Sequence, residues 1–206
     1  PLMPDQPEAV APAPTSAPLA TSTPIPGGTT VGVTLSLHGI GTGGDNINPN
    51  SEGNMSPLHP QRTVTVDVYD AQNQLAVTKQ GLVTFDSVSG KFKGIVDLGA
   101  NVTTGSYTVK VKVGQYLRTL ITGIQNMTAA QENQLPLASM TSGEINGDNL
   151  INILDYNILM GCYSDLLPAV DCSSSNNVLA DLNDDGAVNQ LDYNFFIREL
   201  SNIQGQ

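Results

Sequence analysis

The amino-acid sequence predicts a mainly β chain, in which an antiparallel sandwich is followed by a small all-α module. Three observations predict this arrangement. Apolar and polar residues alternate through the middle of the chain, a loop-helix pattern occurs twice near its end, and proline is concentrated at its start. Alternation with period two is typical of strands that bury one face, whereas apolar residues three and four apart are typical of helices.

The charge of the chain is strongly acidic and unevenly distributed. The 206 residues include 19 acidic and 8 basic residues, a formal net charge of −11. Residues 143–206 hold ten acids and one base, so −9 of the −11 lies there. This balance argues against a nucleic-acid binder, and a negative field confined to one segment indicates a bound cation. We also find no apolar run of membrane-spanning length.

Composition divides the chain into three parts. Residues 1–28 contain eight of the 13 prolines and predict an extended tail or linker, because proline prevents a helix or a central strand. Residues 29–139 carry the strand pattern. Residues 143–206 carry the acidic repeat. We therefore expect a tail, a β-sandwich and an all-α module in that order.

The middle part contains six segments with clear alternation, at residues 31–38, 63–70, 75–85, 91–98, 106–113 and 116–124. About seven short strands over such a length indicate an antiparallel sandwich of immunoglobulin-like or prealbumin-like type. This stretch resembles the carboxypeptidase-regulatory-like and related modules of bacterial surface proteins. The resemblance implies a scaffold or adhesion role.

Residues 39–61 form a long Gly/Asn-rich segment without periodicity. Two interpretations remain open for it. It is either a surface loop, or a tether through which the first strand reaches a neighbouring copy and completes its sheet. His38 and His59 lie in or beside this segment without a catalytic partner, and we expect both to be surface residues.

The last part contains an internal repeat. A shift of 37 residues superimposes residues 144–160 on residues 181–197 with seven of 17 positions identical. In each copy, oxygen-bearing residues occupy loop positions 1, 3, 5, 9 and 12, the spacing by which an EF-hand-like loop wraps a hard cation. Calcium fits this donor set and zinc does not. The candidate ligands are Glu144, Asn146, Asp148, the Leu150 carbonyl, Asn152 and Asp155 in loop one, and Asp181, Asn183, Asp185, the Ala187 carbonyl, Asn189 and Asp192 in loop two.

Asp at position 12, Asn at position 9 and a single helix after each loop resemble the dockerin type I repeat, over about residues 143–200. The resemblance implies a module that binds two calcium ions and plugs into a cohesin. No catalytic motif in the sequence argues for an enzyme. Two departures concern loop one, where Glu144 replaces Asp at position 1 and Asn149 replaces Gly at position 6. Because Asn adopts the left-handed conformation less readily than Gly, we expect loop one to bind calcium more weakly.

Positions 10 and 11 help cohesin-binding dockerins to recognise their partner and are often Ser-Thr. Here these positions hold Ile153-Leu154 and Gln190-Leu191, so the sequence does not predict ordinary cohesin recognition. Apolar residues continue through both helices and predict the core between them. The expected core residues are Leu154, Ile158, Leu159, Leu191, Phe195, Phe196 and Leu200.

Cys162 and Cys172 are the only cysteines and lie in the connection between the repeats. A disulfide is favoured over two free thiols, and closing so short a loop stabilises by about 3 kcal/mol on the chain-entropy estimate. A disulfide indicates an exported protein, at the cell surface or outside the cell.

Three functions remain open at this stage. The first is a calcium-stabilised subunit that assembles with copies of itself into a surface fibre or array, which the tail, the tether and the lack of catalytic motifs favour. The second is a recognition module in which the sandwich supports the dockerin, as in X-module-dockerin pairs, and a cohesin is the partner. The third is the C-terminal fragment of a secreted hydrolase.

Overall fold

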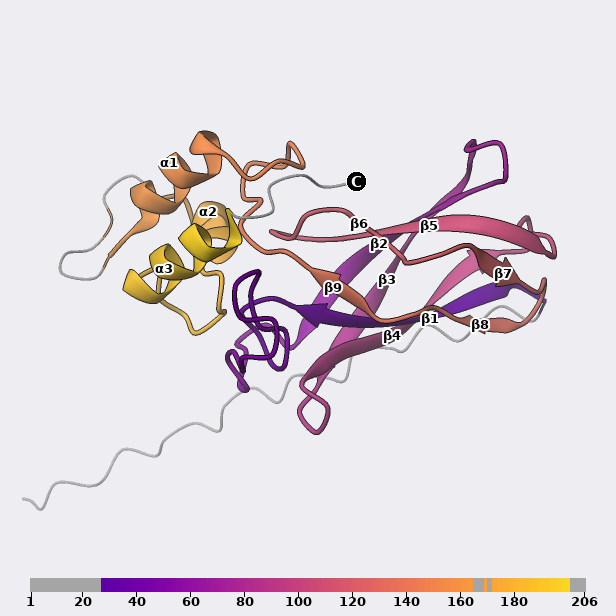
Figure 1. The fold of residues 1–206 in the computed structure, drawn as a ribbon, viewed down its shortest axis with the longest axis horizontal. Coiled ribbons are helices and arrows are strands. Elements are labelled where there is room, and N and C mark those ends of the chain that lie inside the picture. The colour runs from indigo at the N-terminus through magenta and orange to yellow at the C-terminus, as the bar shows by residue number, and fades with distance from the viewer. Residues whose placement is uncertain (1–26, 165–168, 170–171, 201–206) are drawn as a thin grey trace, which may run out of the picture.

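A computed structural model describes residues 27–164, 169 and 172–200 of the chain. The expected proline-rich tail, residues 1–28, lies almost wholly outside the described residues. Figure 1 shows the helices gathered at one end of a β-sandwich. The buried apolar residues form two clusters, one between the layers of the sandwich and one among the helices.

Nine strands form within the described residues. The five long ones coincide to within two residues with the segments expected from alternation, and four short ones follow. They are β1 (Thr29–Leu37), β2 (Gln61–Tyr69), β3 (Leu75–Asp86), β4 (Lys91–Gly99), β5 (Gly105–Val113), β6 (Thr119–Leu120), β7 (Gln125–Met127), β8 (Glu132–Gln134) and β9 (Ala138–Met140).

The strands are hydrogen-bonded in the order β6-β5-β2-β3-β4-β1-β8, with β7 added to β5 and β9 added to β1. Strand β3 pairs with β2 over most of its length and with β4 only through its last residues, Thr84–Asp86, so this strand connects the two layers. All pairs among the five long strands are antiparallel, which confirms the expected sandwich. The short strands β8 and β9 instead run parallel to β1.

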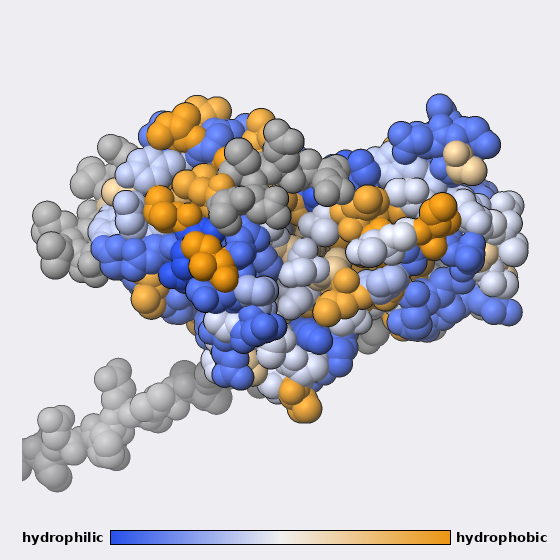
Figure 2. Space-filling view, viewed as in Figure 1, coloured by the Kyte–Doolittle hydropathy of each residue, from blue (hydrophilic) through white to orange (hydrophobic). Residues whose placement is uncertain are grey.

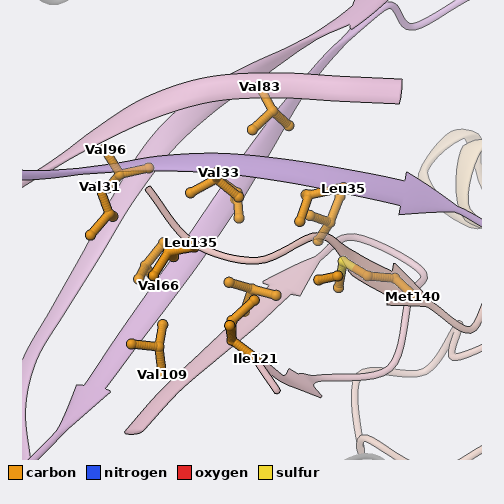
Figure 3. Close-up of a cluster of buried hydrophobic side chains, with 14 of the residues drawn as sticks. Val31, Val33, Leu35, Val66, Val83, Val96, Val109, Ile121, Leu135 and Met140 are labelled. Carbon is orange, nitrogen blue, oxygen red and sulfur yellow. The ribbon is translucent and has the colours of Figure 1, made fainter. Parts of the chain in front are cut away.

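The core of the sandwich follows from the alternation. Val31, Val33 and Leu35 of β1 meet Val66 of β2 and Val109 of β5 between the layers (Figure 3), and all five side chains are at most 2% exposed. Burying one such side chain stabilises by about 1.5 to 3 kcal/mol. This cluster makes the sandwich a rigid support for the segments at its end.

Strand β1 is paired within its own chain on both edges, with β4 on one side and with β8 and β9 on the other. All of its residues except one are buried. This pairing gives no support to the interpretation that β1 is exchanged with a neighbouring copy.

The expected strand at residues 116–124 is wrong in length, because only Thr119–Leu120 pairs with β5. The backbone groups of Tyr116 and Leu117 instead pair with the segment that follows β9. The Leu117 N–H donates to the Thr141 carbonyl at 2.8 Å, and Tyr116 forms a bridge with Ser142. Leu117 thereby leaves the sandwich and joins the cluster among the helices.

The last part of the chain contains three helices, α1 (Ile153–Cys162), α2 (Ser174–Ala180) and α3 (Gln190–Glu199). Helices α1 and α3 confirm the helix expected after each loop, whereas α2, in the connection between the repeats, was not expected. The equivalent tyrosines of the two repeats, Tyr156 and Tyr193, contact each other with ring centroids 6.4 Å apart. The repeats therefore pack against one another.

The predicted core of these helices is confirmed for Leu159, Phe195 and Phe196, which are buried. It is wrong for Leu154 and Leu191, which are 54% and 59% exposed. Each of these leucines precedes the buried residue Leu159 or Phe196 by five positions. Five positions amount to a rotation of about 140° around a helix, which carries both leucines away from the buried face.

Cys162 and Cys172 form the expected disulfide, with their Cα atoms 4.7 Å apart. The bond joins the last residue of α1 to the segment that leads into α2. No helix in the described part of the chain is long and apolar enough to cross a membrane.

Candidate metal centre

Loop two, residues 181–192, is closed by Asp192. This carboxylate is buried, and its Oδ1 accepts hydrogen bonds from the N–H groups of Leu182 at 2.8 Å and Asn183 at 3.3 Å. Its Oδ2 accepts from the Asn189 N–H at 2.9 Å, and the Asn189 side chain in turn caps α3. One pair of residues, Asn189 and Asp192, therefore both starts the helix and closes the loop.

The first residue of loop two, Asp181, is also held by the loop backbone. Its Oδ1 accepts from the Asp185 N–H at 3.1 Å and its Oδ2 from the Gly186 N–H at 2.8 Å. The side chains at positions 3 and 5 contact each other, because the Asn183 amide donates to Asp185 Oδ2 at 2.9 Å. The side chain at position 9 contacts the backbone at position 7, since the Asn189 amide donates to the Ala187 carbonyl at 3.4 Å.

The electrostatics of loop two favour a bound cation. Burial, aided by the charge of Asp181, raises the pKa of Asp192 from 3.8 to about 6. Burial also raises the pKa of Asp181, and the neighbouring Asp185 and Asp184 charges act in the same direction. A divalent cation would remove the mutual repulsion that contributes to both shifts.

Loop one, residues 144–155, repeats this arrangement. Asp155 is buried, and its Oδ1 accepts from the N–H groups of Ile145 at 2.7 Å and Asn146 at 2.9 Å. Its Oδ2 accepts from the Asn152 N–H at 2.9 Å. The amides of Asn146 and Asn152 both donate to Asp148 Oδ2, at 3.0 and 3.2 Å. The structure thus brings positions 3, 5 and 9 together.

Position 6 of each loop adopts the expected left-handed conformation, with φ of 64° at Asn149 and 98° at Gly186. Asn149 also receives a hydrogen bond from the β-sandwich, since the Arg118 N–H donates to its Oδ1 at 2.7 Å. This bond holds the Asn side chain in place at a turn where the residue type alone is less favourable than Gly.

The first residues of the two loops differ in their surroundings. Glu144 Oε1 accepts from the Gly147 N–H at 2.5 Å, while Oε2 forms an ion pair with the Lys112 ammonium group of β5. At Asp181, by contrast, both oxygens accept from the backbone of its own loop. Sequence reasoning missed Lys112, because it lies 32 residues before Glu144 and only the fold brings the two together.

Loop two is fastened to the sandwich through Asp184, which occupies position 4 and is not a predicted ligand. Its Oδ1 contacts His59 Nδ1 at 2.5 Å, and its Oδ2 lies 3.0 Å from the Arg62 guanidinium. The amide of Asn54 donates to the carbonyls of Asn183 and Asp184, both at 2.9 Å. The Gly/Asn-rich segment 39–61 is therefore a packing element that holds the second loop.

A second group of contacts fastens α3. His38 Nδ1 lies 3.0 Å from Glu199 Oε2, and both residues are buried, so the expectation of a surface histidine is wrong for His38. The amide of Asn46 donates to the Glu199 carbonyl at 2.8 Å, and Arg198 Nε donates to Asp45 Oδ2 at 2.8 Å. In Figure 1, segment 38–60 lies between the strands and α3, where these contacts occur.

The donor set of both loops fits calcium better than a transition metal. Each loop contains three carboxylates, two amide oxygens and one backbone carbonyl at the six expected positions, with no sulfur or imidazole among them. In the described part of the chain, no three Asp, Glu, His or Cys side chains form a ready-made metal cluster. The expected donors are therefore mixed sets, in which amides and carbonyls contribute half of the oxygens.

Comparison with known proteins identifies the last part of the chain. The family model of the dockerin type I domain matches residues 142–201. Residues 142–201 form a dockerin type I domain. The fold is also similar to a solved chain from a type II cohesin-X-dockerin complex of Acetivibrio cellulolyticus, with a TM-score of 0.49, 22% sequence identity and coverage of 84% of this chain and 95% of that chain. No curated protein sequence matches this chain.

The dockerin exposes apolar side chains at the start of both of its repeat helices. Ile153 and Leu154 are 65% and 54% exposed at the start of α1, and Leu191 is 59% exposed at the start of α3. Apolar residues appear on the helical end in Figure 2 among hydrophilic ones. Because Leu154 and Leu191 occupy the same position of the two repeats, the apolar surface is repeated together with the loops.

An apolar groove lies at the start of α1, beside Ile153. It has a volume of about 220 Å³ and is lined by Asn152, Ile153, Tyr156, Phe196 and Leu200. The groove runs between the start of α1 and the end of α3. The dockerin therefore presents a partner with a shallow apolar recess next to exposed aliphatic side chains.

Proposed function

We propose that this chain is a recognition module in which the β-sandwich carries a dockerin that binds two calcium ions and docks on a cohesin of another protein. One observation carries the proposal. The dockerin exposes Leu154 and Leu191 at equivalent positions of its two repeats, next to the candidate calcium loops. Exposed aliphatic side chains are typical of a protein-binding surface, and those at the start of α1 also adjoin the apolar groove.

The calcium proposal rests on the twelve donors named from the sequence. Bound calcium would supply positive charge that neutralises the carboxylates and ties each loop to its helix. The chain's own residues do the rest: Asp155 and Asp192 hold the backbone of their loops in place and cap α1 and α3. With three carboxylates and one divalent ion, each loop retains a net charge of about −1.

The sandwich has a supporting role in this proposal. Asp184, Glu199 and Glu144 each connect the dockerin to the sandwich by a charged contact, from three different segments of the dockerin. These contacts hold the dockerin in a single orientation, and a pre-oriented module loses less entropy on binding. We place the sandwich boundary near residue 139 and the start of the dockerin near residue 143.

Self-assembly into a fibre, which the sequence favoured, is not confirmed. Its suggested connectors were the tail, which lies almost wholly outside the described residues, and strand β1, which is paired within its own chain. Binding to a cohesin fits the dockerin domain better than self-assembly does. Dockerin-cohesin systems act outside the cell, and the Cys162–Cys172 disulfide agrees with an oxidising compartment.

The test is calorimetry of the full chain against a panel of type I and type II cohesins, in calcium and after chelation. We expect binding to at least one cohesin in calcium and none after chelation. The double variant Leu154→Ser and Leu191→Ser should weaken it by at least about tenfold, since each change removes an exposed aliphatic anchor. The control Ile124→Ser changes a side chain that is 70% exposed but lies on the sandwich.

Two results would contradict the proposal. One is the absence of binding to every cohesin of the panel, together with concentration-dependent assembly of the chain in calcium, which would favour the fibre. The other is an equal loss of binding in the double variant and in the Ile124→Ser control.

A further inference from the structure

Lys112 is the one lysine of β5 whose side chain reaches the dockerin in the described structure. Strand β5 alternates, with Tyr107, Val109, Val111 and Val113 facing the core and the lysines facing outward. Lys110 lies over the Tyr69 ring, on the sandwich itself. The Lys112 ammonium group instead pairs with Glu144 Oε2 and donates to the Tyr116 carbonyl at 2.5 Å.

This ion pair is largely shielded from water. The side chain of Glu144 is fully buried and that of Lys112 is 21% exposed. An ion pair with little access to solvent is weakly screened by salt, so it persists at salt concentrations that weaken exposed ion pairs. The positive charge therefore stays next to the first ligand position of loop one.

The sandwich places positive charge at both loops, but at positions of different kinds. In loop two, His59 and Arg62 contact Asp184, which is not a ligand, and the described contacts show no lysine or arginine at Asp181. In loop one, Lys112 contacts Glu144, the position-1 ligand itself. The positively charged side chains of the sandwich thus hold loop two through a residue that is not a proposed calcium ligand. In loop one, by contrast, Lys112 pairs with a carboxylate that is a proposed ligand.

We propose that Lys112 is an internal competitor of calcium that makes loop one the weaker of the two calcium sites. The inference rests on the proposed binding of two calcium ions. For Glu144 to serve as a ligand, its carboxylate must release or share the ammonium group, and the ion must sit beside a fixed positive charge. Calcium in loop one and the Lys112–Glu144 contact therefore oppose each other, so filling loop one loosens this attachment of the dockerin to β5.

The variant Lys112→Met removes the charge and keeps an unbranched apolar stem. We expect the full chain to bind two calcium ions with unequal affinity, and Lys112→Met to strengthen the weaker site by at least about tenfold, given the strength of close charge pairs in a shielded site. The stronger site should stay within about twofold, because distant, independent sites behave additively. Titration with calcium alone, followed by calorimetry, gives both constants.

Two further variants keep the result interpretable. Lys112→Arg retains the positive charge and should retain the weak site, whereas Lys110→Met removes a lysine two residues away that faces Tyr69 and should change neither constant. Asp148→Asn assigns the weaker site to loop one if that site is lost. Circular dichroism and thermal unfolding check that each variant is folded.

The outcomes separate this inference from the proposed function. Two unequal sites with the weaker one unchanged in Lys112→Met, or equally strengthened in Lys112→Arg, would overturn the role of Lys112 and leave the two-ion proposal standing. No calcium binding by wild type or variants would overturn both. A weaker site assigned to loop two would also overturn the inference.

Discussion

The variant Asp192→Asn tests whether a buried charge at Asp192 destabilises loop two when calcium is absent. Asp192 is fully buried and its pKa is raised from 3.8 to about 6, chiefly by burial and further by the Asp181 charge. Asn has nearly the same shape but no charge. Its oxygen can still accept from Leu182 and Asn183, whereas its NH₂ group would face the Asn189 N–H.

The sign of the pH dependence follows from the direction of this shift. Because the pKa is higher in the folded than in the unfolded state, folding favours protonated Asp192. Its contribution to the free energy of unfolding is complete below about pH 4 and is lost as the pH rises through about 6. A shift of about two units corresponds to about 3 kcal/mol, of which about 2 kcal/mol is lost between pH 4.5 and 7.5.

The assay is urea unfolding of wild type and Asp192→Asn in chelator, at about pH 4.5 and about pH 7.5. The variant lacks one hydrogen bond, worth about 1 kcal/mol, so it should be the less stable protein at pH 4.5. At pH 7.5 the order should reverse, since only the wild type then buries a charge. Glu199 also has a raised pKa, but it is present in both proteins and cancels in the difference. Asp181 is coupled to Asp192 through their charges, so the variant also relieves repulsion on Asp181, which adds to the reversal at pH 7.5.

Calcium should restore the original order at pH 7.5, because the ion stabilises the wild type at loop two and the variant lacks that carboxylate. The control Glu132→Gln removes an exposed carboxylate of β8 and should leave the pH dependence unchanged. A stability difference between Asp192→Asn and wild type that stays constant from pH 4.5 to 7.5 would refute the reasoning.

Three further predictions concern the attachments of the dockerin and its disulfide. Glu199→Gln should reduce the loss of stability between about pH 4.5 and 7.5, because burial raises the pKa of Glu199 and only the wild type buries this charge beside His38 at the higher pH; urea unfolding at both pH values measures the change. Asp184→Asn should expose segment 39–61 to limited proteolysis, because it breaks the ion pair that fastens this segment to loop two; an unchanged cleavage pattern would count against the attachment. Reducing the Cys162–Cys172 bond should lower the stability by about 3 kcal/mol, and an unchanged melting temperature in reductant would contradict this.

The parts of this protein that could be predicted from its sequence are those whose causes are local. The five long strands follow from alternation over eight or more residues. The loops follow from side chains that bond to the backbone within about twelve residues, as Asp192 does with Leu182 and Asn189. The helix after each loop follows from the same Asn–Asp pair, since this pair caps it. A repeated local pattern contains all the information that these elements need.

Other features could not be predicted, because they depend on which distant segments meet. Strands β7, β8 and β9 have three residues each, too few for a period to be recognised. Leu154 and Leu191 fit a helical apolar pattern as well as Leu159 does, and only the packing of the helices decides which face is covered. Exposure, and with it the proposed partner surface, is therefore a property of the tertiary structure.

The sequence by itself determined the two loops and the disulfide, and it carries the proposed donors, because each needs only residues that are close along the chain. The tertiary structure alone decided how the loops differ. His59 reaches Asp184 across 125 residues and Lys112 reaches Glu144 across 32, and no local pattern records such pairs. The physical reason is that a charge acts on whatever the fold places beside it, so the same loop motif acquires different electrostatics in its two copies.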